Sequence, residues 1–166
     1  MNFYSFQGIV TEINDFIMGQ NAETEGCFKL ITVEDRHGGI VHFVVSPTTY
    51  FVDHAIVTPG DRITGYYDGD APVPLIYPPQ YRALIMVKER NDQTVKVDYF
   101  NNQLVSRDGQ LQLNLSPYTP ILLRNGQPFS KNIGNQNLIV IYGPATKSIP
   151  AQTTPYRIIV WCPNGS

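Results

Sequence analysis

His37, His42 and His54 are the only histidines of the chain, and they are the first candidates for acid–base or metal chemistry. His37 and His42 flank the "GG" pair at 38–39, where a tight turn would bring them close together. With His54 they could ligate a metal ion. We favour the simpler interpretation of one turn, one strand and one loop histidine. No metal site and no catalytic histidine is therefore predicted.

Serine and cysteine nucleophiles need a positioned base and an oxyanion site, and no sequence signature of either is present. Ser46 and Ser116 each precede a proline, which is typical of hydroxyls that begin a turn and bind local backbone. Cys27 and Cys162 lie far apart and form no metal or redox motif. We expect both cysteines to be buried and unpaired. No catalytic residue is predicted from these side chains.

Three acidic clusters, "AETEG", "VEDRHG" and "YDGDA", could carry carboxylate chemistry. Paired carboxylates serve glycoside hydrolysis, and "DGD" at 68–70 could help to hold a hard cation. The stretch lacks the spaced ligands of a calcium loop, so solvated loop charge is the favoured interpretation. A hydrolase using these residues is the most remote function considered. No cofactor is predicted, because no glycine-rich phosphate loop is present.

The elements that would position such residues are predicted to be strands. The chain has 13 Gly, 13 Pro and 10 Tyr among 166 residues and is only 16% charged, a mixture typical of an all-β protein with many turns. Alternating patterns predict strands in the first half at 6–16, 27–35, 40–46, 62–69 and 81–89. They predict strands in the second half at 94–100, 102–106, 110–116, 120–124, 137–143 and 156–161.

The first half resembles an OB-fold. Its order is three strands, a short connector and two further strands, with Gly8 placed to bend the first strand. The resemblance rests on strand order and length and contains no diagnostic motif.

Similar segments recur in the same order in both halves, which predicts an internal duplication. The fold class is therefore expected to be all-β, with two tandem small OB-like β-barrels, the second shorter or partly open. The predicted domains are 1–90 and 91–166. The separation of matched residues is 70 positions at Ser46/Ser116, and it is 75 at Tyr67/Tyr142, Tyr81/Tyr156 and Arg82/Arg157.

Two longer motifs, "PVPLIYPPQYRA" and "SIPAQTTPYRIIV", carry a family resemblance. They resemble motifs of an uncharacterised bacterial family, mostly from spore-forming Gram-positive bacteria. The resemblance would cover most of the chain. It implies kinship alone and transfers no catalytic or binding residue.

The stretch "DGDAPVPLIYPPQYR" at 68–82, a stiff and aromatic loop that leads into the strand at 81–89, is the candidate binding surface. Tyrosine and proline offer a large contact area at a small entropic penalty, so a partner-binding loop is one interpretation. The alternative is a plug, in which the loop folds back over the barrel end or packs between the halves. The candidate partner-binding residues are Leu75, Ile76, Tyr77, Pro78, Tyr66, Tyr81 and Arg82.

Charge is distributed unevenly along the chain. Residues 1–90 hold six Lys and Arg against eleven Asp and Glu, a net −5, and residues 91–166 hold six against three, a net +3. An acidic first half and a basic second half indicate a protein partner or self-association. The acidic first half would repel a phosphate backbone, so nucleic acid is possible but not favoured.

The expected function is a non-catalytic binding or structural module acting through protein–protein contacts. The alternative is an OB-type protein that binds single-stranded nucleic acid or an oligosaccharide. No signal peptide or membrane-spanning run is recognisable, so no membrane is expected. A cytoplasmic location is expected, although a secreted fragment without its leader would give the same pattern.

Overall fold

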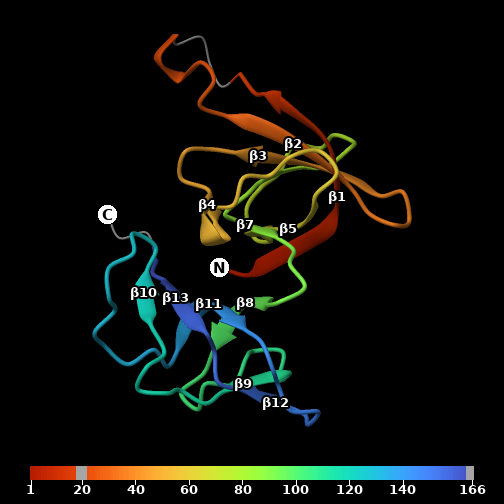
Figure 1. Cartoon of the computed structure of the whole chain (residues 1–166). Helices are drawn as coiled ribbons and strands as arrows, with labels where there is room; N and C mark the ends of the chain where they lie inside the picture. Colours follow the sequence, from red (N-terminus) through yellow and green to blue (C-terminus); the bar gives the residue numbers. More distant parts are fainter. Residues whose placement is uncertain (18–21, 164–166) are drawn as a thin grey trace. The chain divides into compact units, whose positions relative to one another are not determined.

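The computed structural model describes residues 1–17 and 22–163, and strands form all of its sheets (Figure 1). These residues form a seven-stranded, a four-stranded and a two-stranded sheet. The predicted all-β class is therefore confirmed, while no closed barrel is found among the described strands. Within the same residues, no helix is long and apolar enough to cross a membrane.

The chain divides into two compact units, Met1–Glu89 and Arg90–Ser166, called unit 1 and unit 2 below. Unit 1 contains β1 (Phe3–Asp15), η1 (Ala22–Thr24), β2 (Lys29–Glu34), β3 (Ile40–Val45), β4 (Tyr50–Phe51), η2 (Val52–His54), β5 (Arg62–Asp68), β6 (Gln80–Arg82) and β7 (Ile85–Lys88). Unit 2 contains β8 (Thr94–Phe100), β9 (Leu111–Leu113), β10 (Ile121–Leu123), β11 (Gln136–Tyr142), β12 (Ala151–Thr153) and β13 (Arg157–Trp161).

The sheet of unit 1 has the order β4-β7-β5-β1-β2-β3-β6. β6 and β7 are separated by only Ala83 and Leu84, yet β6 pairs with β3 and β7 pairs with β5 and β4. The N–H of Ala83 donates to the carbonyl of Val44 at 3.0 Å, and the N–H of Leu84 donates to the carbonyl of Tyr66 at 2.8 Å. The segment 80–88 therefore changes partner strand within two residues, which we call the strand switch.

Unit 2 repeats this pattern of pairing. β8 is antiparallel to β11 as β1 is to β5, and β11 is antiparallel to β13 as β5 is to β7. The parallel pairs β9/β12 and β10/β13 match β3/β6 and β4/β7. The predicted strand at 102–106 forms only two isolated bridges, Phe100–Ser106 and Val105–Gln112, where unit 1 has β2.

The register of the parallel pairs corrects the predicted alignment of the two halves. Phe43 pairs with Tyr81 in unit 1, and Leu113 pairs with Thr153 in unit 2. Leu113 follows Phe43 by the same 70 positions that separate the Ser-Pro segments. Thr153 is therefore the counterpart of Tyr81, and the predicted match with Tyr156, like the Arg match beside it, is wrong by three positions. Backbone pairing sets the register of these strands. The repeated Tyr-Arg dipeptide, at 81–82 and at 156–157, does not lie at equivalent positions in that register.

The Ser-Pro segments form the same hydrogen-bonded turn in both units. Thr49 Oγ1 accepts the N–H of Ser46 at 3.0 Å and donates to the carbonyl of Ala83 at 2.8 Å. Thr119 Oγ1 accepts the N–H of Ser116 at 3.3 Å and contacts the carbonyl of Pro155 at 3.5 Å. The serine hydroxyls accept backbone N–H groups two residues later, which confirms their predicted role as turn hydroxyls.

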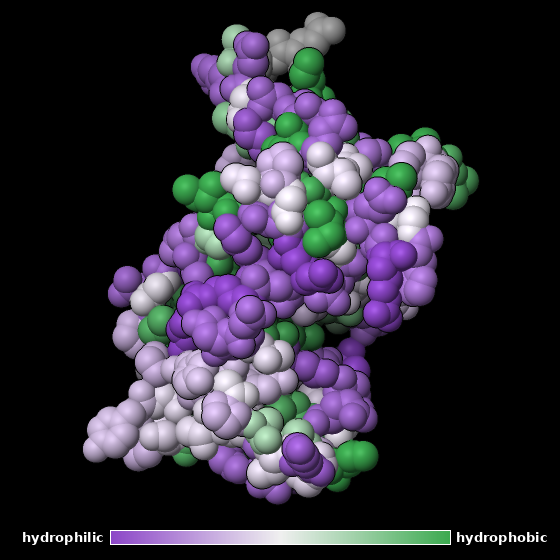
Figure 2. All heavy atoms as spheres, turned by 45° about the vertical axis from the view of Figure 1, so that its right-hand side comes forward, coloured by the Kyte–Doolittle hydropathy of each residue, from purple (hydrophilic) through white to green (hydrophobic). Residues whose placement is uncertain are grey.

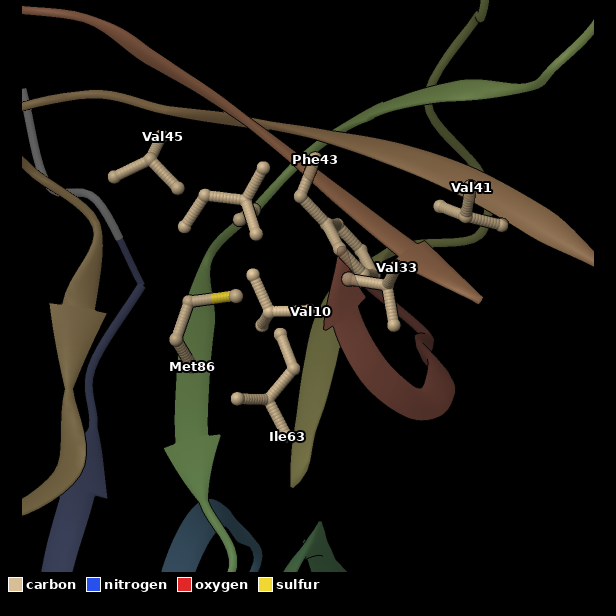
Figure 3. Packing of buried hydrophobic residues seen from close by; sticks show 9 residues of the cluster. Val10, Val33, Val41, Phe43, Val45, Ile63 and Met86 are labelled. Atoms are coloured by element: carbon tan, nitrogen blue, oxygen red, sulfur yellow. The ribbon is translucent and has the colours of Figure 1, made fainter. Parts of the chain in front are cut away.

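Each unit has its own apolar core. Alternation along β2 directs Ile31 and Val33 inward, where they are almost completely buried. In unit 1, the side chains of Val10, Ile63 and Met86 point toward one another from β1, β5 and β7 (Figure 3). The core residues of unit 2 are Phe100, Leu111, Leu113, Ile133, Leu138, Val140, Ile158 and Val160.

The two predicted cysteine environments differ from the structure. Both cysteines are free, as expected, but Cys27 is exposed and Cys162 is half-buried. Cys27 lies in the connection between η1 and β2, where its Sγ donates to the carbonyl of Glu23 at 3.7 Å. The prediction that both are buried is therefore wrong.

Gly65 and Gly143 allow a matched test of core packing. A Cβ on Gly65 would lie 2.5 Å from the ring of Phe43, which is fully buried and cannot move aside. A Cβ on Gly143 would overlap the hydroxyl end of the Tyr156 ring, including Cζ at 2.6 Å, but this half-exposed side chain can turn away. We expect Gly65→Ala to lower the free energy of unfolding by about 1–3 kcal/mol, as overpacking does.

Urea unfolding followed by circular dichroism measures the difference, with Gly143→Ala as the control. We expect the control to lose clearly less stability than Gly65→Ala. Equal losses in the two variants would show that Phe43 does not constrain the position of Gly65.

Candidate functional site

The loop between β5 and β6 is fixed at both ends by backbone hydrogen bonds. The N–H of Gly69 donates to the carbonyl of Asn2 at 2.8 Å, and the N–H of His42 donates to the carbonyl of Pro79 at 2.9 Å. Asp70 donates its N–H to the carboxylate of Asp68 at 3.0 Å, which forms a turn at the start. The loop therefore leaves and rejoins the sheet at defined positions.

The tip of this loop is exposed. Leu75, Ile76 and Tyr77 have exposed fractions of 101%, 54% and 78%, and Val73 is also exposed. We call residues 73–77 the apolar tip. Side chains this exposed do not cover the core of unit 1, so the predicted plug over its end is wrong. On the face seen in Figure 2, apolar residues stand in small patches among hydrophilic ones.

A group of four rings lies at the base of the loop. Tyr67 of β5 and Tyr81 of β6 are stacked, with ring centroids 3.8 Å apart and an interplanar angle of 6°. Tyr4 of β1 meets Tyr67 edge-on at 6.1 Å, and Phe43 of β3 lies 6.3 Å from Tyr67 and 6.4 Å from Tyr81. This aromatic cluster joins both strands that flank the loop and fixes their spacing.

The structure therefore divides the predicted site residues into groups. Leu75, Ile76 and Tyr77 lie together at the apolar tip, and half-buried Pro78 follows them. Tyr81 belongs to the aromatic cluster, and exposed Arg82 follows it on β6.

Tyr66 precedes Tyr67 on β5, and strand alternation directs these two side chains to opposite faces of the sheet. Tyr66 is therefore not part of the cluster. Sequence reasoning missed Tyr4, which is 55% exposed, far from Tyr67 in the sequence and paired with it across β1 and β5. The aromatic residues Phe3, Tyr4 and Phe6 near the start of the chain were a signal that could have indicated it.

The equivalent loop of unit 2 is built differently. The N–H of Thr146 donates to the carbonyl of Gln152 at 2.9 Å. Thr146 Oγ1 accepts the N–H of Gln152 at 2.9 Å and lies 2.7 Å from Ser148 Oγ. Ile149 is the large apolar side chain at its end, with an exposed fraction of 83%. Both loops contain one cis peptide bond before a proline, at Tyr77–Pro78 and Ile149–Pro150. The loop of unit 2 is thus more polar and tied by hydroxyl groups.

The histidines are not brought together. His42 is half-buried on β3 and forms a 2.9 Å hydrogen bond with Thr32 Oγ1, whereas His37 and His54 are exposed. Over residues 1–17 and 22–163, no three His, Cys, Asp or Glu side chains are grouped so that they could hold a metal ion.

The acidic clusters are used locally. Asp35 accepts the N–H groups of His37 and Gly39 and closes the predicted hairpin turn, in which Gly38 has a φ of 81°. Asp70 accepts from the Asn2 amide at 3.3 Å. These carboxylates shape turns and loop ends.

Two tyrosines at corresponding positions of the units have perturbed acidity. Burial and the adjacent Tyr81 raise the pKa of Tyr67 to about 12, and burial raises the pKa of Tyr142 in unit 2. Both hydroxyls stay protonated well above neutral pH. Neither hydroxyl is therefore suited to act as a base near neutral pH.

Comparisons with known proteins give no further assignment. Neither protein families, nor curated proteins, nor solved structures yield a match to this chain. The site is therefore interpreted from its geometry.

The raised pKa of Tyr67 predicts a late step in a tyrosinate titration. In the folded chain Tyr67 should ionise near pH 12, and in denaturant it should ionise near 10 with the other tyrosines. Because its folded pKa is the higher one, its stabilising contribution is complete below pH 10 and is lost as the pH rises through about 12.

Absorbance at 295 nm measures this ionisation. In Tyr67→Phe we expect the step near pH 12 to be absent and the loss of stability between pH 10 and 12 to be smaller. An unchanged late step in that variant would contradict the assignment.

Proposed function

We propose that the chain is a non-catalytic binding module that contacts a protein partner through the apolar tip, residues 73–77. The observation that carries this proposal is the exposure of three consecutive large apolar side chains, Leu75, Ile76 and Tyr77. Single exposed apolar residues are common, but a contiguous group on an anchored loop is typical of a surface that a partner covers.

The base of the loop supports this function physically. The stack of Tyr67 on Tyr81 and the fixed loop ends limit how much conformational entropy the tip loses when it binds. Tyrosine is also among the side chains that contribute most to protein–protein affinity. A stiff base with a bare apolar tip is suited to recognition, and the tip contains no nucleophile or general base.

We further propose that each unit is an OB-like barrel and that the two arose by duplication. The shared strand pairing, the shared Ser-Pro turns and the strand switch support both statements. In an OB-fold, the loop between the fourth and fifth strands is one of the loops used for binding. If β1, β2, β3, β5 and the segment β6–β7 are the five strands of an OB-like barrel, the loop between β5 and β6 that carries the apolar tip has this position.

The position of the loop also favours a second candidate function, the binding of single-stranded nucleic acid or an oligosaccharide. Such sites combine exposed aromatic faces with a basic groove when the ligand is a nucleic acid. Tyr77 supplies an exposed ring, but the net negative charge of unit 1 would repel a phosphate backbone. The rings of Tyr67 and Tyr81 stack on each other, so their facing surfaces cannot stack on a base or a sugar. A protein partner therefore fits the tip better.

Site-specific photo-crosslinking tests the proposal. A photoreactive phenylalanine replaces Tyr77 in one chain and Tyr118, which is 90% exposed in unit 2, in the control chain. In an extract of the source cells we expect a discrete protein adduct from position 77 only. Leu75→Ser in the first chain should reduce this adduct about tenfold, since burial of one leucine contributes about 1.5–3 kcal/mol.

The same adducts from both positions, or an adduct that Leu75→Ser leaves unchanged, would overturn the proposal. Fluorescence anisotropy with a labelled single-stranded oligonucleotide tests the alternative. Tight binding at low salt that Tyr77→Ser abolishes would favour the nucleic-acid function instead.

A further inference from the structure

Unit 1 contains an apolar pocket that is lined by none of the residues of the tip. Its volume is about 320 Å³. β1, β2 and β3 form one wall, and the chain from β4 to just beyond η2 forms the other. The lining residues are Ile13, Lys29, Ile31, Val45, Phe51, Ala55 and Val57.

The wall of the pocket is set by strand register. Ile13 of β1 lies opposite Ile31 of β2, and Lys29 of β2 lies opposite Val45 of β3. Ile31 and Val45 are buried, and Ile13 packs against the core, so the pocket floor is rigid. Lys29 is ion-paired with Asp15, which leaves the pocket itself apolar.

Unit 2 lacks this part of the structure. β8 ends at Phe100, which corresponds to Val10, whereas β1 continues to Asp15. The two isolated bridges of unit 2 stand where β2 would be. Ile13 therefore has no counterpart on β8, whereas Leu104, whose carbonyl accepts the N–H of Leu113, takes the position of Ile31.

The volume of the pocket leaves room for an apolar group. It lies at the lower end of the range typical of pockets that hold whole small ligands, so a single branched aliphatic side chain would fill only part of it. Its lining offers no carboxylate and only one cation, which is already paired. The apolar lining thus favours an apolar group, and charge has to determine which molecule supplies that group.

The net charges of the two units indicate which molecule supplies the apolar group that enters the pocket. Unit 1 holds five Lys and Arg against eleven Asp and Glu, a net −6, and unit 2 holds seven against three, a net +4. Ile149 of unit 2 is exposed, aliphatic and two positions from Lys147. Leu75 is as exposed, but it stands in the acidic unit after Asp68 and Asp70, which disfavours its approach to a second acidic surface.

We propose that the chain self-associates head to tail, with Ile149 of one copy entering the apolar pocket of unit 1 of a second copy. The pocket lies on unit 1 and the inserting residue on unit 2, so each copy offers both halves of the contact. Two copies can exchange the contact reciprocally in a closed dimer, or many copies can repeat it in a ring or an open chain. This inference does not rest on the apolar tip.

Sedimentation velocity of the full chain over a wide concentration range tests the proposal. At low ionic strength we expect the mass to rise with concentration, and at high ionic strength we expect association to weaken, because the units attract through opposite charges. Ile149→Ser should weaken association about tenfold. Ala55→Leu, which fills the pocket from its own wall, should weaken it to a similar extent.

Leu75→Ser is the matched control, since it removes an exposed aliphatic side chain from the tip and should leave association unchanged. This control also separates the present inference from the proposed function. A chain that stays monomeric at every concentration, or association that Ile149→Ser leaves intact, would overturn the proposal. Native mass spectrometry that finds a small apolar molecule displaced by Ala55→Leu would overturn it in favour of a ligand site.

Discussion

The strand switch at Ala83 and Leu84 is the constraint on which the rest of unit 1 depends. Within two residues the chain gives one backbone N–H to Val44 on β3 and the next to Tyr66 on β5. Buried backbone groups must be paired, so this exchange fixes β3 and β5 on either side of one segment. The hydroxyl of Thr49 donates to the carbonyl of Ala83 and so holds the turn of residues 46–49 against the strand switch. Unit 2 places Thr119 and Pro155 in the corresponding arrangement.

The strand switch also explains why the connection between β5 and β6 can carry exposed apolar side chains. The chain leaves β5 at its end and must return beside β3, so a long connection has to pass outside the core. The aromatic cluster closes the base of that connection, with Phe43 packed in the space that Gly65 leaves. Residues beyond the base are free of packing demands. Their character, apolar in unit 1 and more polar around Ile149 in the equivalent loop of unit 2, can therefore differ without disturbing the scaffold.

Much of the strand pattern could be predicted from the sequence, because long alternating runs bury one face whatever their partners. The run at 94–100 matches β8, and the runs at 40–46 and 62–69 match β3 and β5 to within one residue. The short strands β4 and β12 were not predicted, since two or three residues become a strand only when a tertiary partner is present.

The candidate site was harder to predict for a related reason. Residue types indicated an aromatic, apolar loop, but burial decides whether such a loop is a plug or a surface, and burial depends on the whole fold. The stack of Tyr67 on Tyr81 likewise depends on which strands are neighbours. The repeated Tyr-Arg pair misled the alignment, because identical letters carry less information on register than the pattern of buried positions, such as Phe43 and Leu113.

The central claim is that binding resides in an exposed loop on a scaffold that does not need it. Amide hydrogen exchange, measured on the chain alone and on its complex with the crosslinked partner, tests this most directly. The account predicts strong protection of residues 73–77 in the complex and unchanged exchange in β5, β7 and β11, since the scaffold is already formed. Protection confined to other segments, with exchange of the apolar tip unchanged, would contradict it.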